Sequence, residues 1–306
     1  MDLRSFLALA CTSVVLLTGC TPASAPMASP PSSAQHATTT PVATPAASSG
    51  RTSEAAPELR LGSVSNFRDV AGTGAGLAIA DGGHMTRGVV FRSGKLQGLS
   101  STDKKALIKA GITDIFDLRT VKVAERSPDP AVGDAKYHLI NIFAVYTTND
   151  PMPTTVSAAT RERQQLNRDF VTDPKQRKRI GTLLRGIADA KGAVIIHCTE
   201  GKDRTGWASA ILQLIAGADE RTVLDDYLLS NKRRADIIEQ GVAKARKSGR
   251  TAADIARVRL TVADSYLRAG LAELTRRYGD LDGYLTAGLG LDQATLERLR
   301  GKLQTA

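Results

Sequence analysis

Residues 193–206 read "AVIIHCTEGKDRTG". The apolar run Ala193–Ile196 has the length of a buried strand, and it leads directly into a polar loop that contains Gly201 and Gly206. Residues 205–216 are apolar on nearly every side, as expected of a helix that packs against a sheet. A buried strand, a glycine-containing loop and an apolar helix in this order predict an α/β fold.

The rest of the chain extends this unit into a sheet with helices on both faces. Ser100 and Asp103 have the spacing of a capping box at the start of one helix, which Gly111 ends. We expect strands at 89–92, 113–118 and 137–142, and helices at 100–110, 161–190, 223–229, 235–247, 252–278 and 293–303. Strands that alternate with helices indicate a mainly parallel central sheet flanked by helices.

The amino-terminal segment has the features of an export signal. Phe6–Leu17 is a short apolar stretch behind Arg4, long enough for a signal peptide and too short to cross a membrane. It ends in "LTGC" (residues 17–20), which resembles the lipobox of bacterial lipoproteins. That resemblance implies cleavage after residue 19 and a diacylglycerol on Cys20, which would hold the protein on a membrane outside the cytoplasm. The alternative is an ordinary secretory leader with a cysteine near its cleavage site.

The sequence therefore divides into three parts. Residues 1–19 form the predicted signal peptide, and residues 20–58 are mostly Ala, Ser, Thr and Pro, which favours a flexible tether. Residues 59–306 are long enough for one α/β domain, which we expect to be catalytic.

The net charge of +10 favours acidic partners. These include anionic lipid, phosphorylated ligands and nucleic acid, and nucleic acid is the least expected partner of an exported protein. Basic residues gather at Lys232, Arg233 and Arg234, and again at Lys244, Arg246, Lys247 and Arg250. Such a run either extends a site for a phosphorylated substrate or is an exposed helix face.

The positions of the cysteines single out the loop that follows the strand at 193–196. The chain has three cysteines, and with Cys11 in the leader and Cys20 lipidated, only Cys198 remains as a free thiol. There is no C-x-x-C pair and no zinc-ligand spacing, so neither a disulfide nor a metal or other cofactor is expected.

The loop has the composition of a phosphate site with a nucleophile in it. Backbone N–H groups at a helix start carry partial positive charge, and Gly201 and Gly206 allow turns that a side chain would block. Arg204 adds a guanidinium fork that suits two phosphate oxygens. A cysteine in such surroundings is expected to be a thiolate near neutral pH, so Cys198 is placed to attack what the loop binds.

Six ordered motifs are similar to those of one family. "HCTEGKDRTG" carries the C-x5-R signature of cysteine-dependent phosphatases, and five flanking motifs resemble a bacterial branch of the tyrosine phosphatases. These motifs are "NFRDVAG" (66–72), "FRSGKL" (91–96), "DLRT" (117–120), "DYLLSN" (226–231) and "RYGDLDGYL" (277–285). The branch includes secreted enzymes that act on phosphotyrosine and on phosphoinositides. The resemblance implies a cysteine-phosphatase-like fold and a phosphorylated protein or phosphoinositide as substrate.

The resemblance also implies a two-step mechanism. Cys198 attacks phosphorus and forms a cysteinyl-phosphate, Arg204 holds the transferring oxygens, and Asp203 protonates the leaving oxygen and then activates water. The familiar Trp-Pro-Asp loop is missing, and Asp117 and Asp150 are the reserve candidates for the acid. The remaining expected substrate-binding residues are Thr199, Glu200, Gly201, Lys202, Thr205 and Gly206, with His197, Asp69 and Asp117 as supports. Thr205 is also expected to donate to the sulfur as it leaves.

Two loop residues have alternative interpretations. Lys202 either adds charge for a second phosphate or is a solvated lysine, and Asp203 either acts as the acid or pairs with a neighbouring base. Glu200 stands where the family has a small residue, and a carboxylate facing the phosphate would disfavour multiply charged substrates.

Residues 154–179 and 232–263 resemble helical lid insertions that cover the site and shield Cys198 from oxidation; the alternative is plain surface helix. Two other classes of function were considered. One is a catalytically silent lipoprotein that only binds phosphate or phosphoprotein. The other is sulfur transfer, which the Arg204-Thr205 pair and the flanking motifs disfavour.

Overall fold

A computed structural model describes residues 58–143 and 152–305. The described residues all belong to one compact unit. The predicted leader, most of the predicted tether, Cys20 and Asp150 lie outside the described residues. Within the described ranges no helix is both long and apolar enough to cross a membrane.

The described residues contain a five-stranded sheet in the order β1-β2-β5-β3-β4. β1 runs antiparallel to β2, and the other neighbouring pairs are parallel, which confirms the mainly parallel sheet. The strands are β1 (Arg68–Asp69), β2 (Val90–Ser93), β3 (Ile112–Asp117), β4 (Lys136–Leu139) and β5 (Ala193–His197). β4 ends earlier than expected, since Ile140 and Ile142 leave the strand and are buried.

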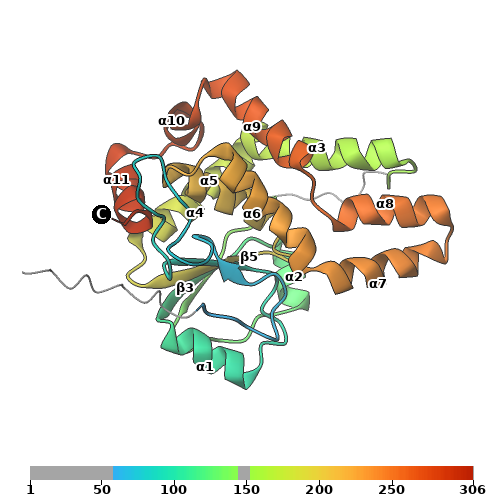
Figure 1. The fold of residues 1–306 in the computed structure, drawn as a ribbon, viewed down its shortest axis with the longest axis horizontal. Helices are drawn as coiled ribbons and strands as arrows, with labels where there is room; N and C mark the ends of the chain where they lie inside the picture. The colour runs from blue at the N-terminus through green and yellow to red at the C-terminus, as the bar shows by residue number, and fades with distance from the viewer. Residues whose placement is uncertain (1–57, 144–151, 306) are drawn as a thin grey trace, which may run out of the picture. The chain divides into compact units, whose positions relative to one another are not determined.

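Side chains of the central strand alternate between two apolar cores. Val194 and Ile196 belong to the larger core, under the helices on one face, and Ala193 and Ile195 belong to the smaller core under α1. Figure 1 shows α1 on one side of the sheet and α4, α5 and α6 on the other. The unbroken apolar run at 193–196 therefore reflects a strand that is buried on both faces.

Helices surround the sheet much as expected. Their bounds are α1 (Ser101–Lys109), α2 (Val121–Arg126), α3 (Val156–Thr172), α4 (Pro174–Asp189), α5 (Arg204–Ile215), α6 (Glu220–Arg233), α7 (Ala235–Arg246), α8 (Arg250–Leu260), α9 (Asp264–Tyr278), α10 (Leu281–Gly283) and α11 (Gln293–Leu303), with a π-helical turn at Tyr284–Gly288. β1, α2, α10 and the π-helical turn had no counterpart in the predicted elements.

Two predicted helices are each broken into two. The helix expected at 161–190 divides at Asp173, whose carboxylate accepts from the backbone N–H groups of Lys175 and Gln176 and caps α4. The helix expected at 252–278 ends near residue 260, because the Asn231 amide makes two hydrogen bonds of 2.8 Å with the backbone of Val262. This second break depends on a tertiary contact that periodicity does not report.

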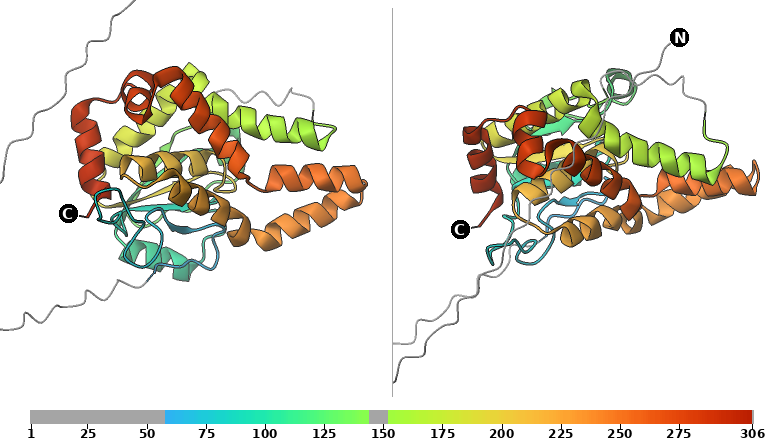
Figure 2. Two further views of the ribbon diagram at one scale, coloured as in Figure 1. Left: turned by 45° about the horizontal axis from the view of Figure 1, so that its top comes forward. Right: turned by 90° about the horizontal axis from the view of Figure 1, so that it is seen from above.

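Helices α7 and α8 pack against each other as a hairpin, and α3 packs against both α8 and α9. Figures 1 and 2 show the hairpin extending away from the sheet, with α3 beside it. The two runs expected to be lid insertions supply α3, α7 and α8.

Candidate active site

Cys198 lies directly after β5 and is buried, with 2% of its surface exposed. The loop 198–203 then turns sharply into α5, so the unpaired N–H groups of the first turn of α5 lie at this loop. Gly201 has a φ of +66°, and a Cβ built on it would lie 2.4 Å from the carbonyl oxygen of Ser93. Both the backbone conformation and the contact with β2 therefore require glycine at this position.

The loop is held from outside through its carbonyl oxygens. The carbonyl of Gly201 accepts from Asn66 Nδ2 at 2.7 Å and from Arg92 Nη2 at 2.9 Å. The carbonyl of Thr199 accepts from the backbone N–H of Lys95 at 3.2 Å. The motifs at 66–72 and 91–96 thus meet the signature loop in space.

Arg92 is buried completely beneath the loop and is close enough to Cys198 for their charges to interact. Burial, with the nearby Arg68, lowers the pKa of Arg92 to about 10, which leaves it charged at neutral pH.

Asp226 joins two of these buried arginines. Its carboxylate contacts Arg68 Nε at 2.7 Å and Arg92 Nη1 at 2.8 Å, and all three side chains are nearly inaccessible. Burial raises the pKa of Asp226, but Arg68 and Arg92 more than offset this and hold it below its usual range. The motif at 226–231 therefore supports the loop from α6.

We predict that Asp226→Ala lowers the free energy of unfolding by about 3–5 kcal/mol, because it leaves Arg68 and Arg92 buried without their counter-ion. Urea unfolding of residues 53–306 measures this change. Asp225→Ala removes the neighbouring exposed carboxylate and is the matched control, with an expected change within about 0.5 kcal/mol. Equal effects of the two substitutions would contradict the assignment.

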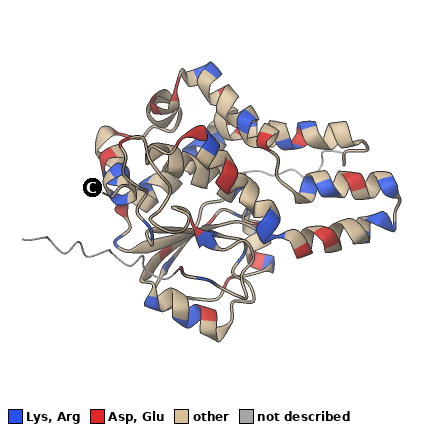
Figure 3. Cartoon of the chain, viewed as in Figure 1, with Lys and Arg blue, Asp and Glu red and all other residues tan. Residues whose placement is uncertain are grey.

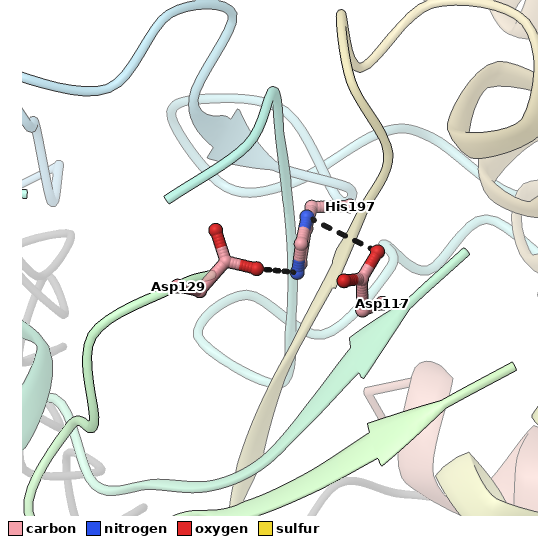
Figure 4. A group of neighbouring side chains, drawn as sticks. All are labelled: Asp117, Asp129 and His197. Carbon is pink, nitrogen blue, oxygen red and sulfur yellow. Dashed lines mark ion pairs between the residues drawn. The ribbon is translucent and has the colours of Figure 1, made fainter. Parts of the chain in front are cut away.

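A second buried network lies behind the cysteine. His197 Nε2 lies 3.3 Å from Asp129 and His197 Nδ1 lies 3.9 Å from Asp117, as Figure 4 shows. Arg119 donates to both carboxylates, and Tyr137 donates to Asp117 at 2.6 Å. Burial lowers the pKa of His197, so its ring is neutral at pH 7 and suits a bracing role.

The ligand atoms of Asp117, Asp129 and His197 lie within 4.8 Å of one another, a spacing that a metal ion could use. Arg119 already supplies the positive charge between the two carboxylates, so we assign the cluster as a brace of the loop. Asp117 is fully buried in this network, where its carboxylate accepts from Arg119 and Tyr137.

Arg204 stands at the start of α5. Its Nη1 donates to the carbonyl of Leu118 at 2.9 Å, and its guanidinium carbon lies 4.4 Å from the ring centroid of Phe143. Its other N–H groups make no hydrogen bond within the described residues, so they remain available to a ligand. Thr205 is fully buried, and its Oγ1 has no partner in the part of the chain that the structure describes.

Asp203 caps the start of α5 by position, but its side chain makes no capping hydrogen bond. Oδ2 lies 3.5 Å from Lys202 Nζ and 3.8 Å from Arg163 Nη1, while Oδ1 is buried and has no hydrogen-bond partner among the described residues. Burial raises the pKa of Asp203, but Lys202, Arg163 and Arg204 together bring it below its ordinary value. The two interpretations from the sequence were that Asp203 is the general acid or that it pairs with a neighbouring basic residue. The position of its carboxylate is compatible with both.

One interpretation from the sequence, that Lys202 is a solvent-exposed lysine, is wrong. It is 1% exposed, and its ammonium donates to the carbonyl oxygens of Arg259 and, at 3.3 Å, of Thr261, at the end of α8. Glu200 lies 3.6 Å from Lys202 and 3.3 Å from Arg234. The carboxylate of Glu200 thus offsets two cations beside the loop.

A cavity of about 630 Å³ lies between this part of the loop and the α7–α8 hairpin. Glu200, Lys202 and Asp203 line one side, and small or aliphatic side chains such as Ala245 and Ile255 line the other. The hairpin covers this part of the site, as expected of the second predicted lid insertion.

Asp69 does not brace the loop as expected. Its carboxylate accepts from the backbone N–H groups of Ala71 at 2.9 Å and Gly88 at 2.6 Å, so it supports the connection between β1 and β2. Burial raises the pKa of Asp69 to about 6. Asn66 makes the contact with the loop instead, and it does so from a left-handed backbone conformation with φ of 57°.

Four supporting residues had no assigned role from the sequence. Asn66, Arg92 and Asp226 stand inside motifs that the resemblance had singled out, so those motifs were the available signal. Asp129, in "SPDP" (127–130), lies outside all six motifs and is identified only by its contact with His197.

The described fold and site define a class. A buried cysteine follows the central strand of a mainly parallel sheet, and an arginine six residues later opens the next helix. This is the arrangement of a cysteine-dependent phosphatase.

The sequence model of the tyrosine phosphatase family matches residues 59–305, so the chain belongs to the tyrosine phosphatase family. It is 30% identical to the triple specificity protein phosphatase PtpB of Mycobacterium tuberculosis, over 78% of this chain and 96% of that protein. It is 28% identical to a protein of Cupriavidus necator that is named as a tyrosine-protein phosphatase, over 78% of this chain and 86% of that one. A tyrosine-protein phosphatase of Nostoc commune is 26% identical, over 70% and 74% of the two chains. These findings show a protein-tyrosine phosphatase.

Proposed function

We propose that the protein hydrolyses phosphotyrosine, and phosphoinositide monoesters as a second substrate class, through a cysteinyl-phosphate on Cys198. Arg204 and the loop amides hold the three non-bridging oxygens of the phosphoryl group. The sulfur displaces the leaving oxygen, and Asp203 passes to that oxygen a proton that arrives on the phosphate of the substrate. Asp203 then takes a proton from the water that releases phosphate. Thr205 Oγ1 is available to donate to the departing sulfur.

The orientation of the loop peptides carries this proposal. The carbonyl oxygens of Thr199, Glu200 and Gly201 all accept hydrogen bonds from outside the loop. Because N–H and C=O of one planar peptide point in opposite directions, the N–H groups that follow these carbonyls are turned to the other side. A row of such amides beside a buried cysteine stabilises the charge of a transferring phosphoryl group.

The second substrate class rests on the charges beside the loop. Lys202, Arg234 and Arg163 lie around Glu200 and Asp203, where a further phosphate or an inositol ring would enter. The relative named as a triple specificity phosphatase supports a range wider than phosphotyrosine. In this arrangement Lys202 contributes to a multiply phosphorylated substrate, and Glu200 opposes it.

We predict that Lys202→Met lowers kcat/KM for a phosphoinositide about tenfold more than for a phosphotyrosine peptide, because one charge-assisted contact to a phosphate is lost. Glu200→Gln is expected to act in the opposite direction, since it frees Lys202 and Arg234 from their counter-ion. Parallel phosphate-release assays on the two substrates give the ratio. If each variant changes kcat/KM by the same factor for both substrates, Lys202 and Glu200 do not set the substrate preference.

We also propose that Cys20 carries a lipid that holds the protein to the cell envelope outside the cytoplasm. The lipobox-like "LTGC" and the Ala/Ser/Thr/Pro-rich stretch after it support this. In cells that express the full chain, Cys20→Ser is expected to prevent acylation and cleavage, so the uncut precursor carries no lipid label. Metabolic labelling with a radioactive fatty acid measures the change, and Cys11→Ser is the matched control. A label that persists in Cys20→Ser would exclude this anchor.

A further inference from the structure

The end of the α7–α8 hairpin is a concentrated positive surface. Residues 244–250 read "KARKSGR", and the four cations Lys244, Arg246, Lys247 and Arg250 are all exposed. We call these four residues the basic tip. Figure 3 shows blue at the far end of the hairpin and red nearer its base on α7. None of the four forms an ion pair with another described residue.

Local helix stability accounts for only part of this charge. Lys244 and Arg246 lie in the last turn of α7, where cations complement the helix dipole. Arg250 is different, because it opens α8, whose first turn contains no acidic residue, and its charge opposes the dipole there. The hairpin therefore concentrates positive charge at its tip, and Arg250 lowers the stability of α8 slightly.

The shape of the tip indicates the kind of partner. Four long, exposed cationic side chains spread over the turn at the end of the hairpin, and none of the large exposed apolar side chains lies in this turn. Such a surface fits a broad, flat array of negative charge. A bilayer containing anionic phospholipid has this form, and each Lys or Arg near it strengthens binding about fivefold.

We propose that the basic tip binds the surface of an anionic phospholipid bilayer. This contact is electrostatic and peripheral, and it is separate from both the active site and the proposed lipid on Cys20. It goes beyond the proposed function, since it assigns the protein a second membrane contact through the folded domain itself. The same hairpin covers Lys202 at its other end, so the bound domain presents its active site near the membrane surface.

Co-sedimentation of residues 53–306 with vesicles tests the proposal without reference to catalysis. We expect binding to vesicles of phosphatidylcholine mixed with phosphatidylglycerol, little binding to phosphatidylcholine alone, and a loss of binding at high salt. Replacing the four residues of the basic tip with glutamine is expected to lower vesicle binding by several hundredfold.

The matched control removes the same charge from another part of the domain. It replaces four exposed cations of α1 and α2 with glutamine: Lys105, Lys109, Lys122 and Arg126. This control is expected to bind vesicles within a few-fold of the unmodified domain. Circular dichroism and turnover of p-nitrophenyl phosphate verify that both variants are folded. Equal losses in the two variants, or no binding of the unmodified domain to anionic vesicles, would overturn the proposal and leave an acidic protein as the partner to test.

Discussion

Cys198→Ser is expected to lower kcat/KM for a phosphotyrosine peptide by about 10⁴-fold or more, to the background of the assay. A serine hydroxyl at position 198 is a far weaker nucleophile than the cysteine sulfur. Phosphate release by residues 53–306 measures the effect.

Binding separates a lost nucleophile from a lost fold. Because Arg204 and the loop amides are unchanged, the serine variant is expected to bind inorganic phosphate within a few-fold of the unmodified domain. Calorimetric titration with phosphate gives this value. If the unmodified domain binds phosphate but releases none from any substrate, the protein is a phosphate-binding member of its family. Turnover that survives in the serine variant would show that another residue attacks phosphorus.

Asp203→Asn is expected to have an effect that depends on the leaving group. General acid catalysis contributes about 10²–10⁴-fold when the leaving oxygen is basic. We therefore predict a loss in that range for phenyl phosphate and a much smaller loss for p-nitrophenyl phosphate, whose leaving oxygen needs little protonation. Turnover of the two substrates by the variant measures the difference.

The pH profile gives an independent test of the same residue. Burial raises the pKa of Asp203, but Lys202, Arg163 and Arg204 bring it below its ordinary value, so the free enzyme holds this carboxylate ionised at neutral pH. The proton for the leaving oxygen must then arrive on the phosphate of the substrate. Hence kcat/KM should fall as pH rises through the second phosphate pKa, which is about 6, and this fall should be lost in Asp203→Asn.

Asp225→Asn changes an exposed carboxylate on α6 and is the matched control for both measurements. An equal loss for the two leaving groups would show that Asp203 acts only through the structure of the loop. A pH profile that is the same in the variant would place the acid elsewhere, and Asp150 would be the next residue to substitute.

Local features of the chain allowed several parts of the fold to be predicted. The strand Ala193–His197, the turn at Gly201 and the helix after it depend on apolar runs, glycine conformation and helix starts, which neighbouring residues determine. The capping of α1 by Ser100 was predicted for the same reason, and its side chain accepts from the N–H of Asp103. The family followed from motif spacing within the sequence.

Contacts between distant residues could not be predicted in this way. Lys202 is buried because the end of α8, 57 residues later, presents a carbonyl oxygen to it. Asp129, in the segment after α2, contacts His197 at the end of β5, although the two residues are far apart in the sequence. The periodicity of apolar residues in the sequence gives no information on either contact.

The sequence by itself therefore determined the class of fold, the family and the strand-loop-helix unit that carries the proposed nucleophile, since each depends on residues a few positions apart. Only the tertiary structure decided that Lys202 faces α8, that Asp69 supports a strand connection, and that Asn66 and Arg92 hold the loop. The physical reason is that a buried polar group must find a partner, and the packing of the whole chain decides which groups are within reach.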